Sequence, residues 1–248
     1  MRSRAALIMF SAPWLFACAG ESPATAGRRW FLAPPMPEAL AALSGSDKVG
    51  VETRDGLAFM PRSDASGVGL VLYSGGYVDP RAYAPAALAL AERGHLVVLP
   101  RMPFGLAFSN VDAATFARVA YPTVRRWVVG GHSLGGVVAA LHARNHQDTV
   151  SGLVLWASYP ADDTDLSPSG LRVTSISGTR DGLTTQARLE ATDRLLPPSA
   201  SRVRIEGGNH AQFGWYGEQE GDLAATLERT EQQERTVTAT AALLDGLR

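Results

Sequence analysis

The chain has 248 residues, which is enough for one sizeable hydrophobic core and short for two full domains. Hydrophobic residues make up 46% of it and charged residues 19%, which excludes an intrinsically disordered protein. The formal net charge is −1 and no block rich in Lys or Arg stands out, with Lys48 the single lysine among 23 basic residues. We therefore expect no nucleic-acid partner, which would need a basic stripe.

Residues 1–26 predict an export signal followed by a tether, and residues 27–248 predict one folded domain. Two arginines precede an uncharged apolar stretch over residues 5–20, which is typical of a secretory signal and short for a membrane span. Residues 15–18 (LFAC) resemble a bacterial lipoprotein box in which Phe16 is an unusual choice. Cys18 is the only cysteine and cannot form an internal disulfide, so it is a candidate for lipidation. Removal of Cys18 with a cleaved signal and retention of an uncleaved anchor are the alternatives. Either way we expect an exported protein of the cell envelope or the medium.

Residues 49–62 then predict a β-hairpin, because alternating strand residues flank the turn-forming pair Asp55-Gly56. Beyond the hairpin, short apolar runs typical of strands buried on both faces alternate with helical patterns. The expected strands are residues 67–76, 95–100, 126–133, 150–158, 172–179 and 202–208. The expected helices are residues 80–94, a segment capped by Asp112 and ending near Val119, and residues 134–146, 184–196 and 228–247. This alternation predicts an α/β fold with a mostly parallel, doubly wound sheet and an antiparallel hairpin at one edge.

A glycine-rich turn lies between the strand at 126–133 and the helix at 134–146. Its sequence, GHSLG, is the G-x-S-x-G pattern of a nucleophile elbow in the strand–turn–helix context that such an elbow requires. The small residues let backbone segments pass closely, and Ser133 is expected at the carboxyl end of the sheet, beside the N-terminus of a helix. The free N–H groups and partial positive charge of that helix end favour a developing oxyanion. Ser133 is therefore the candidate nucleophile, and a solvated serine in a tight turn is the alternative.

A candidate acid and a candidate base follow in the order that this kind of site uses. Asp181 comes directly after the fifth of these expected strands, and His210 comes after the sixth. All three candidates lie at carboxyl ends of strands, where open α/β sheets bind their ligands. His210 would take the serine proton, while Asp181 would fix the imidazole tautomer. Three rival acids, which a solvated loop explains better, are Asp162, Asp163 and Asp165.

An oxyanion hole needs a second N–H donor besides that of Leu134. In this arrangement it comes from the loop at residues 73–79, where two adjacent glycines let the backbone approach a substrate. The candidate donor is Gly76 or Tyr77, and a plain tight turn is the alternative.

The remaining histidines suggest structural roles. His132 is expected to line the wall of the site, and His95 opens a strand. His142 and His146 are four residues apart on one helix face, a spacing able to bind zinc. No glutamate follows His142 and no third ligand is evident, so we expect a packed or solvated face and no metal.

Several stretches together resemble the alpha/beta hydrolase family: residues 70–108, GGHSLGG, SGTRDGL and IEGGNHAQFGWYGEQEGD. The resemblance covers roughly residues 47–248 and is most similar to small bacterial hydrolases of the envelope, with the segment around His210 the most distinctive part. It implies hydrolysis through an acyl-enzyme and no cofactor. Family members usually carry proline where this chain has Ser74, a departure that touches the stiffness of the loop and not its N–H donors.

Only about 15 residues separate the strand at 150–158 from the strand at 172–179, and they show no helix pattern. Many lipases of this fold insert a helical lid there, so we expect an open, shallow site for small or flexible esters. Trp156, Phe104 and Phe213 are candidate wall residues. Two further readings stay open: a binding protein without turnover, and acyl transfer or peptide cleavage by the same triad. The natural substrate and the oligomeric state are not indicated.

Overall fold

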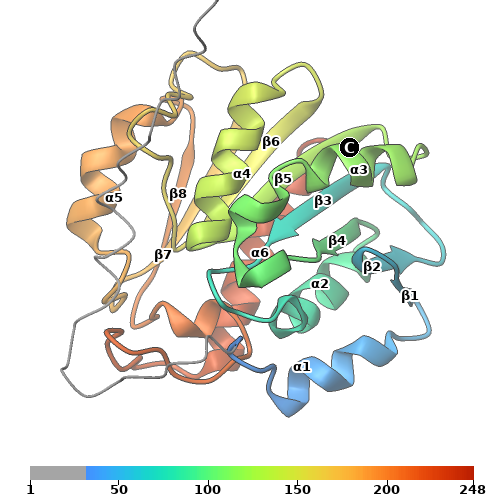
Figure 1. The fold of residues 1–248 in the computed structure, drawn as a ribbon, viewed down its shortest axis with the longest axis horizontal. Helices are drawn as coiled ribbons and strands as arrows, with labels where there is room; N and C mark the ends of the chain where they lie inside the picture. Colours follow the sequence, from blue (N-terminus) through green and yellow to red (C-terminus); the bar gives the residue numbers. More distant parts are fainter. Residues whose placement is uncertain (1–31) are drawn as a thin grey trace, which may run out of the picture.

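Eight strands form one sheet in the order β1-β2-β4-β3-β5-β6-β7-β8 (Figure 1) in the computed structural model, which describes residues 32–248. The strands are β1 (Val49–Thr53), β2 (Gly56–Pro61), β3 (Val68–Tyr73), β4 (Leu96–Pro100), β5 (Arg126–His132), β6 (Val150–Trp156), β7 (Arg172–Gly178) and β8 (Ser201–Ile205). Strands β3 to β8 pair in parallel, whereas β2 pairs antiparallel with both β1 and β4. The predicted parallel sheet with an antiparallel hairpin at its edge is confirmed.

Helices cover both faces of this sheet (Figure 1). They are α1 (Pro37–Ala41), α2 (Ala84–Ala91), α3 (Ala113–Ala120), α4 (Leu134–Asn145), α5 (Gln186–Thr192) and α6 (Arg229–Asp245). Helices α2 and α6 pack together on one face, and α3 and α4 lie on the other.

The core alternates strictly along the central strands. Val128 packs with the α2 and α6 side, while Val129 packs with the α3 and α4 side. Leu70 and Val71 divide in the same way on β3. Because successive side chains of a strand point to opposite faces, a strand covered by helices on both sides has to be apolar throughout. This explains why the strands could be read from continuous apolar runs.

Three local expectations are corrected by the structure. Helix α1 lies in a segment rich in proline and alanine that predicted no element, and its Ala39 is fully buried. Asp112 occupies the N-cap position of α3, but its side chain makes no capping hydrogen bond. The helix expected at 184–196 is α5 followed by a 3-10 turn over Asp193–Leu195.

The predicted signal and tether at residues 1–26, including Cys18, lie outside the described residues. Within residues 32–248, no helix combines the length and the apolar character needed to cross a membrane.

Candidate active site

Ser133 lies between β5 and α4 in a backbone conformation that is rare for residues other than glycine. Its φ is 52° and its ψ is −124°. Such conformations cost free energy and persist where the surroundings over-determine them, often at functional sites. Here the surroundings are close-packed backbone: a Cβ atom at Gly131 would collide with the peptide of Gly135, and one at Gly135 would collide with the peptide of Tyr73. The glycines thus allow the tight turn that carries Ser133.

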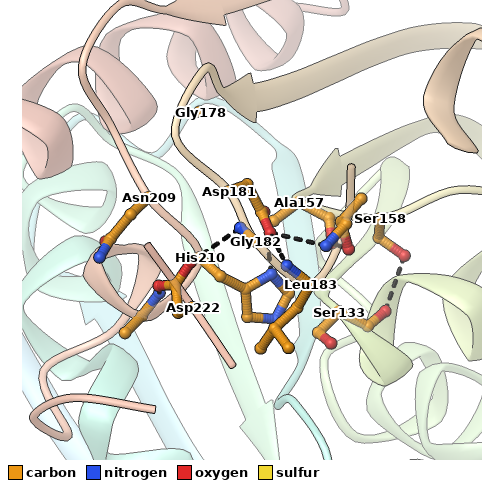
Figure 2. Close-up of polar contacts among 12 residues, drawn as sticks. Ser133, Ala157, Ser158, Gly178, Asp181, Gly182, Leu183, Asn209, His210 and Asp222 are labelled. Carbon is orange, nitrogen blue, oxygen red and sulfur yellow. Dashed lines mark hydrogen bonds and ion pairs between the residues drawn. The ribbon is translucent and has the colours of Figure 1, made fainter. Parts of the chain in front are cut away.

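The turn is fastened to the end of the neighbouring strand β6. The N–H of Ser133 donates to the carbonyl of Trp156 at 3.0 Å, and the hydroxyl of Ser158 donates to the carbonyl of Ser133 at 2.7 Å (Figure 2). A Cβ atom at Gly136 would occupy the place of the Ser158 side chain. The backbone of Ser133 is therefore held on both sides, while its hydroxyl stays available.

His210 and Asp181 form a buried pair. Nδ1 of His210 lies 2.9 Å from Oδ2 of Asp181, and the two side chains are 1% and 0% exposed. The other carboxylate oxygen, Oδ1, accepts the N–H groups of Leu183 and Thr184 at 2.9 and 2.6 Å. An ionised carboxylate only accepts, so the proton between the pair belongs to Nδ1 of His210, and Nε2 keeps a free lone pair.

Nε2 of His210 is buried and has no hydrogen-bond partner among residues 32–248. In Figure 2, Asp181 and Ser133 lie on opposite sides of the His210 ring. Within residues 32–248, no hydrogen bond joins the Ser133 hydroxyl to His210. The three sequence candidates are thus brought to one place.

The rival acids lie elsewhere. Asp162, Asp163 and Asp165 are exposed on the loop after β6, and Asp162 pairs with Arg188 at 3.2 Å. Neither this pair nor the contacts of the other two carboxylates involve His210.

A further carboxylate, Asp222, joins the acid loop to the histidine loop. Its Oδ1 accepts the N–H of Gly182 at 3.0 Å (Figure 2). Oδ1 also accepts the N–H of Leu223 at 2.9 Å, and Oδ2 accepts the N–H of Ala211 at 2.9 Å. Gly182 follows the acid and Ala211 follows the histidine, so one side chain fixes their spacing. No local sequence pattern marks this role, although Asp222 is the last residue of the distinctive stretch around His210.

Helix α6 holds the histidine loop from the other side. The carbonyl oxygen of the Gln232 side chain accepts the N–H of Asn209 at 3.0 Å, and its amide group donates to the carbonyl of Asn209 at 2.7 Å. This exchange resembles one rung of a sheet and leaves the backbone before His210 with little freedom.

The loop after β3 is tied to the elbow through Tyr83. The N–H of Gly75 donates to the Tyr83 hydroxyl at 3.0 Å, and that hydroxyl lies 2.9 Å from Nδ1 of His132. Burial raises the pKa of Tyr83, so the phenol stays protonated, and its O–H donates a hydrogen bond to Nδ1 of His132. Burial, followed by the nearby His210, holds the pKa of His132 well below its usual range.

The two candidates for the second oxyanion donor differ in their contacts. The N–H of Tyr77 donates to the carbonyl of Gly105 at 2.7 Å. The N–H groups of Gly76 and Leu134 have no acceptor within the described chain. Ser74, next to these glycines, is buried and its hydroxyl has no partner within residues 32–248.

The residues expected to line the wall of the site differ in where the structure places them. The His132 ring lies 4.5 Å from the His210 ring, centroid to centroid, and 5.8 Å from that of Phe213. Trp156 was placed wrongly: its side chain is fully buried and donates to Thr240 on α6 at 3.0 Å. Phe104 is 88% exposed on the outer surface. No helix lies between β6 and β7, which confirms the expectation of little or no lid at that point.

The sheet order, the tight turn at Ser133 after β5 and the buried Asp181–His210 pair after β7 and β8 together define a hydrolase-like α/β architecture. The sequence model of the alpha/beta hydrolase family matches residues 69–234, and the chain belongs to this family. Membership supports a hydrolase role. None of the curated proteins matches the chain significantly.

Two solved structures are similar to this chain in fold. One is described as a predicted CIB-like hydrolase from Thermoplasma acidophilum, with a TM-score of 0.58, 15% identity and coverage of 78% of this chain and 99% of that one. The other is TT1662 from Thermus thermophilus, with a TM-score of 0.54, 17% identity and coverage of 79% and 98%. At these identities the likeness concerns the fold alone.

Proposed function

We propose that this protein is a serine hydrolase that cleaves small carboxylic esters through an acyl-enzyme. Ser133 is the nucleophile, His210 the general base and Asp181 the residue that orients it. The supporting observation is the buried His210, held by Asp181 through Nδ1 and keeping Nε2 without a partner beside the strained elbow.

In the first half-reaction, the Ser133 oxygen attacks the ester carbonyl carbon while Nε2 of His210 takes the hydroxyl proton. Asp181 stabilises the imidazolium that forms and keeps its Nδ1–H in place. The tetrahedral intermediate then collapses as the imidazolium gives its proton to the departing alkoxide, so an alcohol leaves and Ser133 is acylated.

The negative charge of the tetrahedral intermediate needs N–H donors that no protein group already uses. Gly76 and Leu134 meet this requirement, whereas the N–H of Tyr77 is engaged by Gly105. We therefore assign the oxyanion hole to Gly76 and Leu134 and not to Tyr77.

Deacylation repeats the sequence with water. Nε2 of His210 accepts a proton from a water molecule, which attacks the acyl carbon, and the proton then passes to the Ser133 oxygen as the carboxylic acid leaves. No step needs a cofactor or a redox partner.

The proposed substrates are small or flexible esters, because the β6–β7 connection carries no helix that could cover Ser133. Hydrolysis rates of p-nitrophenyl esters of increasing chain length test this proposal. We expect the acetate and butyrate esters to be favoured, and a strong preference for long-chain esters with activation at lipid interfaces would contradict it.

Labelling with a fluorophosphonate probe tests the catalytic assignment. We expect the purified protein to be labelled on Ser133 and the label to be lost in Ser133→Ala and His210→Ala. Ser63→Ala, at an exposed serine beyond the hairpin, is the matched control and should label normally. Absence of labelling and turnover in the wild-type protein would favour a binding role. Transfer of the acyl group from Ser133 to an added alcohol would favour an acyltransferase.

We also propose that the protein is exported and lipidated on Cys18. Metabolic palmitate labelling of the wild-type protein and of Cys18→Ser tests this directly. Label in the wild type alone supports lipidation, and absence of label in both supports a discarded signal.

A further inference from the structure

Three possible metal ligands meet where α3 begins and α4 ends. Asp112, His142 and His146 each place one ligand atom within 4.8 Å of those of the other two. Oδ1 of Asp112 lies 3.8 Å from Nε2 of His146, and the two histidine rings stack with centroids 4.3 Å apart. No third ligand is evident from the sequence, but the fold brings Asp112 to this histidine pair.

We propose that Asp112, His142 and His146 bind a divalent transition-metal ion, with Zn²⁺ the best match. Two imidazoles and one carboxylate are a donor set that suits zinc, and a water molecule would complete a tetrahedral shell. Zinc bonds of about 2.0–2.1 Å require tetrahedral ligand atoms roughly 3.4 Å apart. The Asp112–His146 separation of 3.8 Å is already close to that value, and Asp112 is 65% exposed and able to rotate.

The hydrogen bonding of the buried His142 suits it to bind a metal ion through Nε2. Nδ1 of His142 lies 3.1 Å from the carbonyl of Val111, which only accepts, so the ring proton is on Nδ1 and Nε2 keeps a lone pair. Metal-binding histidines usually donate their second ring N–H to a carbonyl or carboxylate in this way.

The carbonyl of Val111 also accepts a hydrogen bond from the Tyr73 hydroxyl at 2.7 Å, and the same hydroxyl accepts the N–H of Ala114 at 3.1 Å. The residues around Asp112 are thus fixed to the sheet, and the ligand set does not depend on a loose loop. The ion would fasten the start of α3 to the far end of α4. His142 is nine residues beyond Ser133, about 14 Å along the helix, so the role is structural and separate from ester hydrolysis.

Calorimetric titration of the untagged, chelator-treated protein with Zn²⁺ tests the proposal. We expect one ion per chain, with affinity reduced about 100-fold or more in Asp112→Asn and His146→Ala. Asp148→Asn, an exposed carboxylate two residues after His146, makes the same charge change and should bind normally. Titration with Co²⁺ should produce the visible absorption of a tetrahedral site in the wild type and in Asp148→Asn alone.

Three results would overturn the proposal: no zinc binding by the wild type, equal binding by all these variants, or loss of binding in His210→Ala alone, which would assign zinc to the hydrolase site. Asp112 and His146 are partly exposed, so both variants should fold, and circular dichroism checks this. Thermal unfolding gives a second readout, because bound Zn²⁺ should raise the Tm of the wild type and not that of His146→Ala.

Discussion

Replacing Asp181 by asparagine changes one atom of the carboxylate and should disable the histidine. The two N–H groups of Leu183 and Thr184 point at Oδ1, so the amide oxygen of an asparagine has to take that place. The opposite orientation would set an NH₂ group against both donors and lose two hydrogen bonds, at about 1–3 kcal/mol for each unsatisfied group. The NH₂ group therefore faces Nδ1 of His210.

A donor facing Nδ1 forces the ring proton onto Nε2. His210 then presents an N–H to Ser133 and cannot accept the hydroxyl proton. Loss of the correct tautomer in a serine triad lowers kcat by about 10⁴, which corresponds to about 5.5 kcal/mol in the activation free energy. We expect a loss of this size with the fold intact.

The assay is p-nitrophenyl acetate hydrolysis by the wild type, Asp181→Asn and Asp163→Asn, with thermal unfolding of all three. Asp163 is exposed, and among residues 32–248 its carboxylate accepts a hydrogen bond only from the neighbouring Thr164 hydroxyl, so its variant is the matched control. If Asp163→Asn abolished turnover while Asp181→Asn stayed within tenfold of the wild type, the assignment of the acid would be refuted.

Three further predictions follow from buried hydrogen bonds and from one histidine. Tyr83→Phe leaves the N–H of Gly75 buried without an acceptor, so urea titration should report about 1–3 kcal/mol of lost stability, and an unchanged midpoint would contradict the network. In Asp222→Asn only one side-chain oxygen remains to accept hydrogen bonds, so the loop at Ala211 should shift. The shift should lower kcat for p-nitrophenyl acetate by up to about 100-fold, while the pH profile of the remaining activity keeps its shape. Burial lowers the pKa of His142 in the folded protein to about 4, below its unfolded value, so the unfolded state binds a proton that the folded state does not. In metal-free protein the free energy of unfolding should therefore be highest above pH 6.5 and fall by up to about 3 kcal/mol toward pH 4. His142→Gln should reduce this pH dependence.

The elbow and the triad candidates could be found from sequence because their signals are local. Glycines at fixed distances from Ser133 mark the tight turn, and continuous apolar runs mark the strands before Asp181 and His210. Once the strands are parallel, their carboxyl ends lie at one edge of the sheet, so three positions far apart in sequence become neighbours by topology alone.

The supporting contacts could not be found in this way, because each joins segments whose distance depends on packing. Asp222 contacts the peptide after Asp181 across 40 residues, and Asp112 meets His142 across 30. Neither contact has a fixed spacing, and Asp112 at the start of a helix suggests a cap, a simpler role that its side chain does not fill. The choice between Gly76 and Tyr77 likewise depends on which N–H another loop engages.

The carboxylates of Asp181 and Asp222 are both held by peptide N–H groups, five in all. Leu183, Ala211 and Leu223 supply three of them without using their side chains, and every amino acid except proline has the same N–H to offer. The backbone conformation, more than the identity of the neighbouring side chains, keeps these two carboxylates in position. Most substitutions at the half-buried Leu183 and the exposed Leu223 should accordingly leave the site unchanged, whereas Ala211 lies in the core, where a larger side chain has no room.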